Sequence, residues 1–216
     1  HDAIEQPPVV VASARAAMQR TMPPNQFRQR TTTIKIGQRH QIDKLLREWQ
    51  SLGYEGTPIV VEPGTFSRKG GVLDIFPISA TQPVRIDFFD DEVDTLRWFD
   101  PATQRSQPGD VREIRITPAR EALPEYLQQI ANHLQPWFAA LPPAEDDMTT
   151  AITDAESLAA GGTFAYMEHY LPYMYAHPVS LLDYAPQDAL IVVEDLTELR
   201  DIITEQTARG VAVIFS

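Results

Sequence analysis

The 216-residue chain contains no cysteine and no long apolar run. Without cysteine it forms neither a disulfide framework nor a thiolate metal site, which agrees with a reducing compartment. None of its apolar runs approaches the roughly 20 residues of a membrane-spanning helix, and the amino end lacks the charged-then-apolar pattern of a signal peptide. We therefore expect a cytoplasmic protein in which 43% apolar residues build a globular core.

Signatures of several enzyme classes are also missing. The GxxxxGK(S/T) loop, with which NTPases hold phosphate, does not occur. Glu194 and Asp195 follow an apolar run, where such enzymes hold a metal ion, but without the loop we interpret this pair as an ordinary strand end. The histidines lack zinc-ligand spacing, and no serine lies in a GxSxG context. We therefore predict no catalytic residue, no bound metal and no cofactor.

Positive charge is scarce, above all toward the carboxyl end. The net charge is −12, and residues 123–216 hold 2 Lys/Arg against 14 Asp/Glu, whereas residues 1–50 hold 8 against 4. Phosphate contacts need clustered Lys and Arg, so the balance argues against a general nucleic-acid binder. The aromatic stretch FAYMEHYLPYMY lies in the acidic part, and we interpret it as packing. The asymmetry indicates at least two units with different surfaces.

Between residues 26 and 116, one helix pattern stands among several strand patterns. QIDKLLREWQSLGY has its apolar residues at helical spacing. Strands are predicted at TTTIKIG and at residues 57–61, 71–76, 84–89 and 93–99. Because short turns connect these strands, we expect an α+β domain in which the helix packs on an antiparallel sheet.

The flanking segments have a different pattern. Near the amino end, residues 9–12 predict a buried-type strand, and a short helix that ends at Pro23–Pro24 follows it. Near the carboxyl end, a strand, a helix and a strand are predicted in that order, at DALIVVEDL, DLTELRDIITEQTARG and GVAVIFS. LPEYLQQIANHLQPWFAAL predicts a helix that ends at Pro142–Pro143. We thus predict an α/β fragment at 1–25, the α+β domain at 26–116, a mostly helical domain at 117–188 and a return to the α/β domain at 189–216. Since the chain ends within the last predicted strand, we expect a piece of a longer protein.

The predicted strand at residues 84–89 has an unusual outer face. Alternation places Val84, Ile86 and Phe88 on one side, and Arg85, Asp87 and Phe89 on the other. The second set suits a second packed layer, with Phe89 covering the adjacent helix and Arg85 paired with Asp87. It equally suits a partner-binding surface, because interface hot spots favour aromatic and Arg side chains. The residues alone leave both interpretations open.

The turn after this strand is acidic. Asp90, Asp91, Glu92 and Asp94 carry hard oxygen ligands of the kind that Mg²⁺ and Ca²⁺ prefer. Acidic residues are also common in hairpin turns, and the spacing is not that of a calcium loop. A metal-dependent enzyme that uses these acids is an alternative, although the hairpin interpretation is favoured.

Two consecutive segments resemble domain 2 of the UvrB-like module, which the repair protein UvrB shares with the transcription-repair coupling factors. These segments are EPGTFSRKGGVLDIFP and PVRIDFFDDEVDTLRWFDPATQRS. VVVASARAAMQRTMPP and ITPA resemble the segments that enter and leave that domain. GGTFAYMEHYLPYMY and LLDYAPQDALIVVED are more similar to the coupling factors than to UvrB. The resemblance covers practically the whole chain, and a UvrB fragment is the alternative within it.

The resemblance implies that the α+β domain is inserted between parts of a degenerate, RecA-like α/β module. The phosphate loop and the DNA-inserting hairpin of UvrB would precede residue 1. The ATP-dependent DNA translocase, with its ATP and Mg²⁺, and the RNA-polymerase-binding domain would follow residue 216. The present chain would then be a non-catalytic recruitment module that binds UvrA and brings nucleotide excision repair to stalled RNA polymerase.

Four positions match the UvrA-binding pattern of the family, and these are Lys69, Arg85, Asp87 and Phe89. Lys69 replaces an Arg of the pattern and so lacks the planar fork of a guanidinium. Ser67 and Gly56 stand where UvrB has further arginines. Arg68 is offset by one residue, and strand alternation predicts that it lies on the other face.

Overall fold

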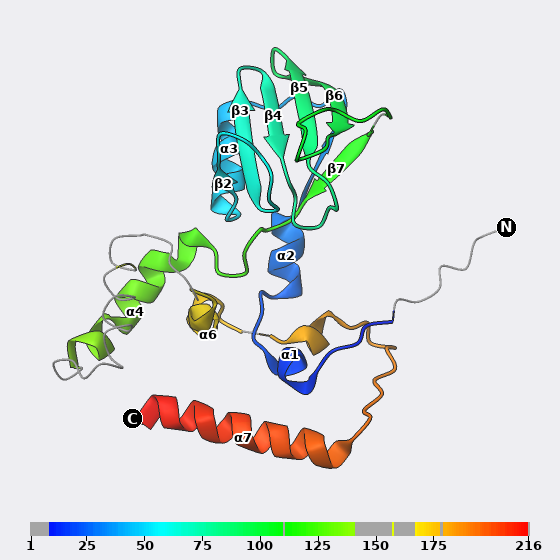
Figure 1. The fold of residues 1–216 in the computed structure, drawn as a ribbon. Coiled ribbons are helices and arrows are strands. Elements are labelled where there is room, and N and C mark those ends of the chain that lie inside the picture. The colour runs from blue at the N-terminus through cyan, green and yellow to red at the C-terminus, as the bar shows by residue number, and fades with distance from the viewer. Residues whose placement is uncertain (1–8, 110, 141–156, 158–166, 178, 216) are drawn as a thin grey trace. The chain divides into compact units, whose positions relative to one another are not determined.

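The computed structural model describes residues 9–109, 111–140, 157, 167–177 and 179–215. The chain divides into two compact units, one formed by His1–Thr21 with Pro178–Ser216 and the other by Met22–His177. Within the described ranges, none of the helices combines the length and the apolar character that crossing a bilayer requires. The larger unit contains the sheets and a separate cluster of helices (Figure 1).

The main sheet has five strands in the order β2-β3-β4-β5-β6. Their bounds are β2 Glu55–Gly56, β3 Thr65–Lys69, β4 Val72–Ile75, β5 Val84–Phe89 and β6 Glu92–Trp98. All neighbouring pairs are antiparallel except β2 and β3, which are parallel. A second, two-stranded antiparallel sheet pairs β1, Thr32–Lys35, with β7, Glu113–Ile116. The architecture is therefore α+β, as the sequence predicts.

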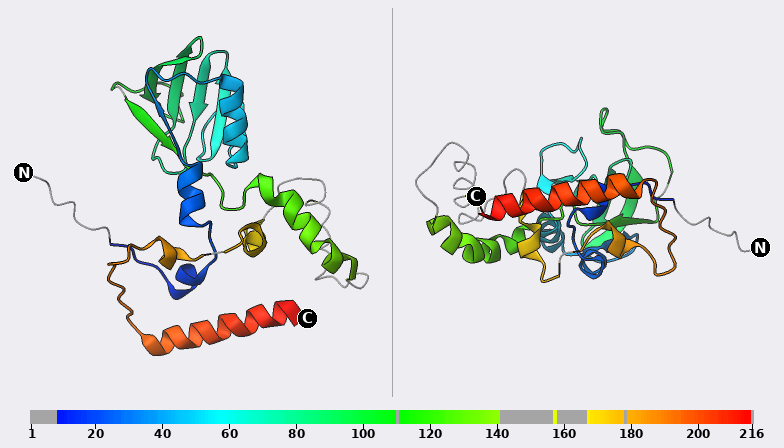
Figure 2. Two further views of the ribbon diagram at one scale, coloured as in Figure 1. Left: turned by 180° about the vertical axis from the view of Figure 1, so that it is seen from behind. Right: turned by 90° about the horizontal axis from the view of Figure 1, so that it is seen from below.

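Helix α3, Ile42–Ser51, covers one face of the main sheet (Figure 2). Its buried residues Leu45 and Trp49 lie on one side of the helix, as expected of an amphipathic segment. The Trp49 ring meets the Phe66 ring edge-on, with 5.6 Å between centroids. Further core residues from both sheets join this cluster, among them Ile34, Leu73, Ile75, Val84, Ile86, Leu96, Ile114 and Ile116. We call the side of the sheet that faces α3 the core face.

A β-bulge in β6 decides which side chains face the core. Asp87 pairs with Thr95, but Phe88 pairs with Val93, so Asp94 is an extra residue on β6. Without it, strict alternation would place Val93 on the same face as Thr95. With it, Val93 is fully buried and Thr95 lies on the opposite face. Alternation along β5 stays intact, so Phe88 packs against the core cluster.

Two details of the α+β domain differ from the sequence-based prediction. Residues 57–61 do not form a strand. Thr57 still donates its N–H to the Phe66 carbonyl, but Pro58 has no N–H with which to continue the ladder. The chain instead turns, and Val60 is buried in a small cluster with Phe76 and Phe99. The second difference is that β3 and β7, which are rich in polar residues, form strands that the apolar patterns did not predict.

The helical cluster of the larger unit contains α2 Pro24–Arg30, a turn at Pro124–Tyr126, α4 Leu127–Ala140, a turn at Met167–Tyr170 and α6 Leu171–Met174. Met167, Leu171 and Met174 are buried in it, so the described part of the aromatic stretch packs as predicted. Burial raises the pKa of the Tyr175 hydroxyl, which donates to the Glu121 carbonyl at 2.7 Å. The predicted helix end at Pro142–Pro143 lies outside the described residues.

The smaller unit contains α1 Ala14–Met18, a helical turn at Leu181–Tyr184 and α7 Leu196–Phe215. The side chain of Ser13 caps α1 by accepting from the N–H of Ala16. Pro23–Pro24 does not end α1, which stops at Met18; Pro24 begins α2, because a proline at the first helical position needs no N–H acceptor.

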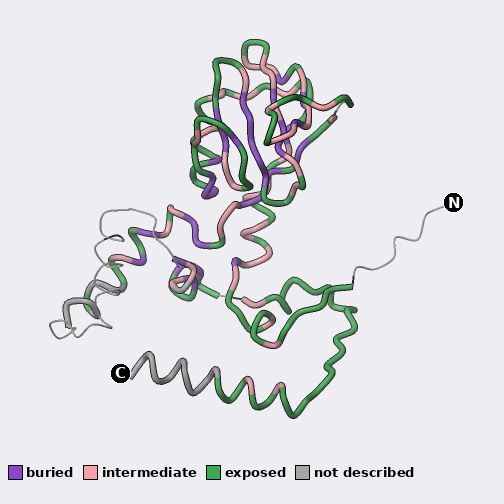
Figure 3. Tube along the Cα trace, viewed as in Figure 1, coloured by how far each residue is buried: buried purple, intermediate pink, exposed green. Residues whose placement is uncertain are grey.

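Three predicted strands of the α/β parts are absent from the structure. Residues 9–12 and 188–193 are extended or turned and exposed, and α7 continues through the segment predicted as the last strand. A strand is stable only when a neighbour pairs its N–H and C=O groups, and no described segment pairs with these runs. Residues 9–12 and 188–193 are consequently mostly exposed (Figure 3), with Val11, Leu190 and Val192 each more than 80% exposed.

Candidate functional site

The face of the main sheet opposite α3 brings the predicted site residues together. Because residues paired across an antiparallel ladder point to the same side, the register puts two rows on this face. One row is Ser67, Asp74, Arg85 and Arg97; the other is Lys69, Val72, Asp87 and Thr95. Phe89, two residues beyond Asp87 on β5, lies on the same face, beyond the second row. We call this surface, formed by the two rows and Phe89, the open face.

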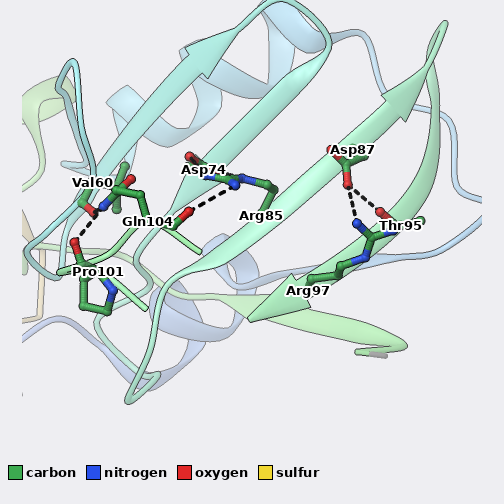
Figure 4. A network of polar contacts seen from close by, with 8 residues as sticks. All are labelled: Val60, Asp74, Arg85, Asp87, Thr95, Arg97, Pro101 and Gln104. Atoms are coloured by element: carbon green, nitrogen blue, oxygen red, sulfur yellow. Dashed lines mark hydrogen bonds and ion pairs between the residues drawn. The ribbon is translucent and has the colours of Figure 1, made fainter. Parts of the chain in front are cut away.

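Arg85 is held by a nearly buried carboxylate on the neighbouring strand (Figure 4). Its Nε donates to Asp74 Oδ1 at 2.7 Å and its Nη2 to Asp74 Oδ2 at 2.8 Å, which makes the pair bidentate. The side chain of Asp74 is 3% exposed and that of Arg85 is 22% exposed. These bonds raise the pKa of the Arg85 guanidinium above its ordinary value. The interpretation in which Arg85 pairs with Asp87 is therefore wrong.

A loop after β6 completes the environment of Arg85. The guanidinium carbon lies 4.9 Å from the centroid of the Phe99 ring, and Nη1 donates to the Gln104 carbonyl at 3.4 Å. The Gln104 side chain donates from Nε2 to the carbonyls of Val60 and Pro101, at 3.0 and 2.7 Å (Figure 4). Most of the hydrogen-bonding capacity of Arg85 is thus used within the domain.

Asp87 and Arg97 are held more loosely. Thr95 Oγ1 donates to Asp87 Oδ2 at 2.6 Å, while Arg97 Nη1 lies 3.8 Å from the same oxygen (Figure 4). That separation permits charge attraction but exceeds a hydrogen bond. The side chains of Arg97 and Asp87 are 43% and 29% exposed. Both remain accessible to a partner.

Phe89 and Lys69 stand at the ends of two hairpins. Phe89 is 80% exposed and precedes a tight turn in which Asp90 adopts a φ of 59°, a conformation that Asp tolerates better than most residues. Lys69 is exposed and precedes Gly70, whose φ of 64° suits glycine. Within the described ranges, the side chain of Lys69 forms no hydrogen bond or ion pair. The exposure of Phe89 rules out the interpretation in which it covers a helix.

Ser67, Gly56 and the neighbouring Arg68 add no positive charge to the open face. Arg68 is on the core-face side of β3, as alternation predicts, and its Nη1 lies 2.5 Å from Asp43 Oδ1 at the start of α3. Ser67 is buried on the open face and Gly56 is exposed on β2. Arg68 therefore does not supply a second guanidinium to the open face.

Two of the four acidic candidates, Asp91 and Glu92, contact Arg39. Arg39 places Nη1 3.3 Å from Asp91 and Nη2 3.4 Å from Glu92. In the part of the chain that the structure describes, no cluster of three or more His, Asp or Glu suits a metal ion. Asp195 ends no strand; its Oδ1 accepts the N–H groups of Thr197 and Glu198 at the start of α7.

Comparison with known proteins identifies the domain that carries the open face. Residues 32–121, which include all seven strands of the described residues and the whole open face, match the UvrB interaction domain family. The chain contains a UvrB interaction domain. Its homology extends beyond that domain: it is 34% identical over 205 residues, 90% of its length, to the transcription-repair-coupling factor of Bacillus subtilis. It is also 32% identical over 183 residues to that of Staphylococcus epidermidis and 29% identical over 177 to that of Haemophilus influenzae, each match covering 81% of the chain.

The match covers only a small part of each relative. The chain spans 17% of the B. subtilis protein and 15% of the other two. The UvrB interaction domain is therefore one segment of much longer homologues.

Sequence reasoning missed the residues that support the open face. One signal was available for Asp74, because a carboxylate between the apolar neighbours Leu73 and Ile75 on a strand is nearly always paired when buried. Arg97 could have been placed by its pairing with Arg85, but only once the β6 register was known. Gln104 and Phe99 lie in a loop, and no local pattern connects them with Arg85.

Proposed function

We propose that this chain is a non-catalytic recruitment module of a transcription-repair coupling factor, and that its open face binds UvrA. The family of the domain and the names of the relatives support a role in repair coupling. The observation that carries the proposal is Phe89, an aromatic side chain left 80% exposed beside charged residues on a rigid sheet. Such aromatic and Arg clusters are typical of interface hot spots.

The proposed contact set is Lys69, Arg85, Asp87 and Phe89. Phe89 supplies apolar area and Asp87 an accessible carboxylate, and Lys69 supplies a positive charge that no ion pair holds among the described residues. Arg85 contributes the N–H groups of its guanidinium that remain after Nε and Nη2 have each donated to Asp74. Because the sheet fixes the spacing of these groups, binding requires little further ordering of the chain and loses little conformational entropy.

In the full-length protein, other parts would do the mechanical work. ATP, Mg²⁺, DNA and RNA polymerase belong in this proposal to regions outside the chain, and the present segment brings UvrA to the stalled polymerase in the cytoplasm. A UvrB fragment is the alternative, and the relatives named above, which are coupling factors, favour the first assignment. An intact phosphate loop upstream of residue 1 would instead indicate UvrB.

The test is a titration of purified UvrA against the chain and against two variants. Phe89→Ala removes the exposed aromatic side chain of the open face, and Ile78→Ala is the matched control, since Ile78 is an exposed apolar residue in the loop between β4 and β5. We expect the unmodified chain and Ile78→Ala to bind UvrA equally. Phe89→Ala should weaken binding by about 2 kcal/mol or more. Absence of binding by the unmodified chain would refute the proposed function.

A further inference from the structure

Arg97 is a charged residue of the open face that the family pattern does not assign. It lies directly opposite Arg85 across the β5–β6 ladder. Like charges in that position destabilise a sheet unless each is compensated. Arg85 is compensated by the bidentate pair with Asp74, whereas Arg97 has, among the described residues, only the Asp87 oxygen at 3.8 Å. Arg97 therefore keeps most of its hydrogen-bonding capacity.

The open face carries cations and carboxylates in similar number, because Glu92 pairs with Phe89 across the ladder and joins Asp74 and Asp87 on this side of the sheet. The two kinds of charge differ in how far they are satisfied within the domain. Lys69 forms no ion pair in the described part of the chain, and Arg97 is 43% exposed. Carboxylates of a partner would complement these two cations.

We propose that Arg97 is a further partner-contacting residue, which binds carboxylates of UvrA together with Lys69, and that Arg85 chiefly positions the surface. This inference rests on the proposed function and adds the chemistry of the partner, an acidic patch beside an apolar recess for Phe89. Breaking the loose contact with Asp87 costs little, because exposed ion pairs contribute little stability. Redirecting Arg85 would break two charged bonds to the buried Asp74.

The assignment is tested with Arg97→Gln, which removes the charge and keeps a polar side chain. Arg115→Gln is the matched control, because Arg115 is an exposed residue of β7 in the other sheet. UvrA affinity is measured for both variants at low and high salt, and thermal unfolding is recorded in parallel. We expect Arg97→Gln to weaken binding about tenfold at low salt, with a smaller salt dependence and an unchanged melting temperature. Arg115→Gln should bind like the unmodified chain.

The outcomes separate the two proposals. If Phe89→Ala weakens binding but Arg97→Gln does not, the assignment of Arg97 is refuted while UvrA binding by the open face stands. If both Arg variants weaken binding equally, the effect is one of overall charge and Arg97 is no specific contact. If the unmodified chain fails to bind UvrA, the proposed function and this inference fall together.

Discussion

The two faces of the five-stranded sheet come from the same strands and serve different ends. On β5, Val84 and Ile86 are fully buried against α3, whereas Phe89 on the opposite face is 80% exposed. The core face holds apolar side chains that exclude water. The open face holds charged side chains in two ion pairs, a close one between Arg85 and Asp74 and a looser one between Arg97 and Asp87. Alternation lets one short strand specify both packing and binding, so substitutions on one face should leave the other almost unaffected.

The largest effect should come from the core face. Ile86→Ala removes a side chain that is fully buried among α3 and the neighbouring strands, and the cavity should lower the free energy of unfolding by about 2–5 kcal/mol. Urea denaturation measures this loss. Val72→Ala on the open face is the control and should cost much less. Equal losses of unfolding free energy at both positions would mean that the two faces contribute equally to stability.

Asp74 sharpens the comparison, because it lies on the open face and is buried. Asp74→Ala leaves Arg85 without its bidentate acceptor and should lower the free energy of unfolding by about 2–3 kcal/mol. Asp87→Ala is the matched control; it removes the Thr95 hydrogen bond and the loose contact with Arg97, both of which lie near solvent, and should cost about 1 kcal/mol. Chemical denaturation of both variants checks the order. If Asp87→Ala costs more than Asp74→Ala, the account of the two pairs is wrong.

A smaller effect is expected at Tyr54, on the core side. Its buried hydroxyl donates to the Thr117 carbonyl at 2.9 Å, and Tyr54→Phe should cost about 1 kcal/mol at neutral pH. Burial raises the pKa of Tyr54 to about 12. The folded state therefore favours the neutral phenol, so this stability is complete below pH 10 and is lost as the pH rises through 12.

Chemical denaturation between pH 10 and 12 tests whether the stability contributed by Tyr54 falls as the pH rises. The unmodified chain should lose stability over this interval more steeply than Tyr54→Phe, which has no phenol to ionise. Parallel curves for the two proteins would show that Tyr54 does not contribute to the alkaline loss.

The parts of the fold that follow from local periodicity were predictable. The apolar spacing of α3 and the alternation of β5 correctly separate buried from exposed residues, and Arg68 falls on the predicted side of β3. The four residues of the family pattern also share one face, which the register shows. Whether they bind UvrA stays a prediction.

Features that depend on residues distant in the sequence were not predictable. The Arg85–Asp74 pair joins two strands, and the guanidinium is then enclosed by a loop that no periodicity describes. From sequence alone, Arg85→Glu looks like a clean binding variant; in the structure it would oppose two carboxylates, one of them buried, and destabilise the domain. The apolar runs at residues 9–12 and 190–193 look like strands, but strand formation requires a pairing neighbour.

The central claim is that Phe89 on the open face of β5 serves UvrA binding, whereas Phe88 on the core face serves folding, and these adjacent phenylalanines test it most directly. Phe88 packs against the core and Phe89 is exposed. Unfolding free energy and UvrA affinity should be measured for Phe88→Ala and Phe89→Ala side by side. We predict that Phe88→Ala loses about 3 kcal/mol of stability, while Phe89→Ala unfolds like the unmodified chain and loses about 2 kcal/mol or more of affinity. The account is contradicted if Phe89→Ala destabilises the fold and Phe88→Ala does not, or if Phe89→Ala binds UvrA at full strength.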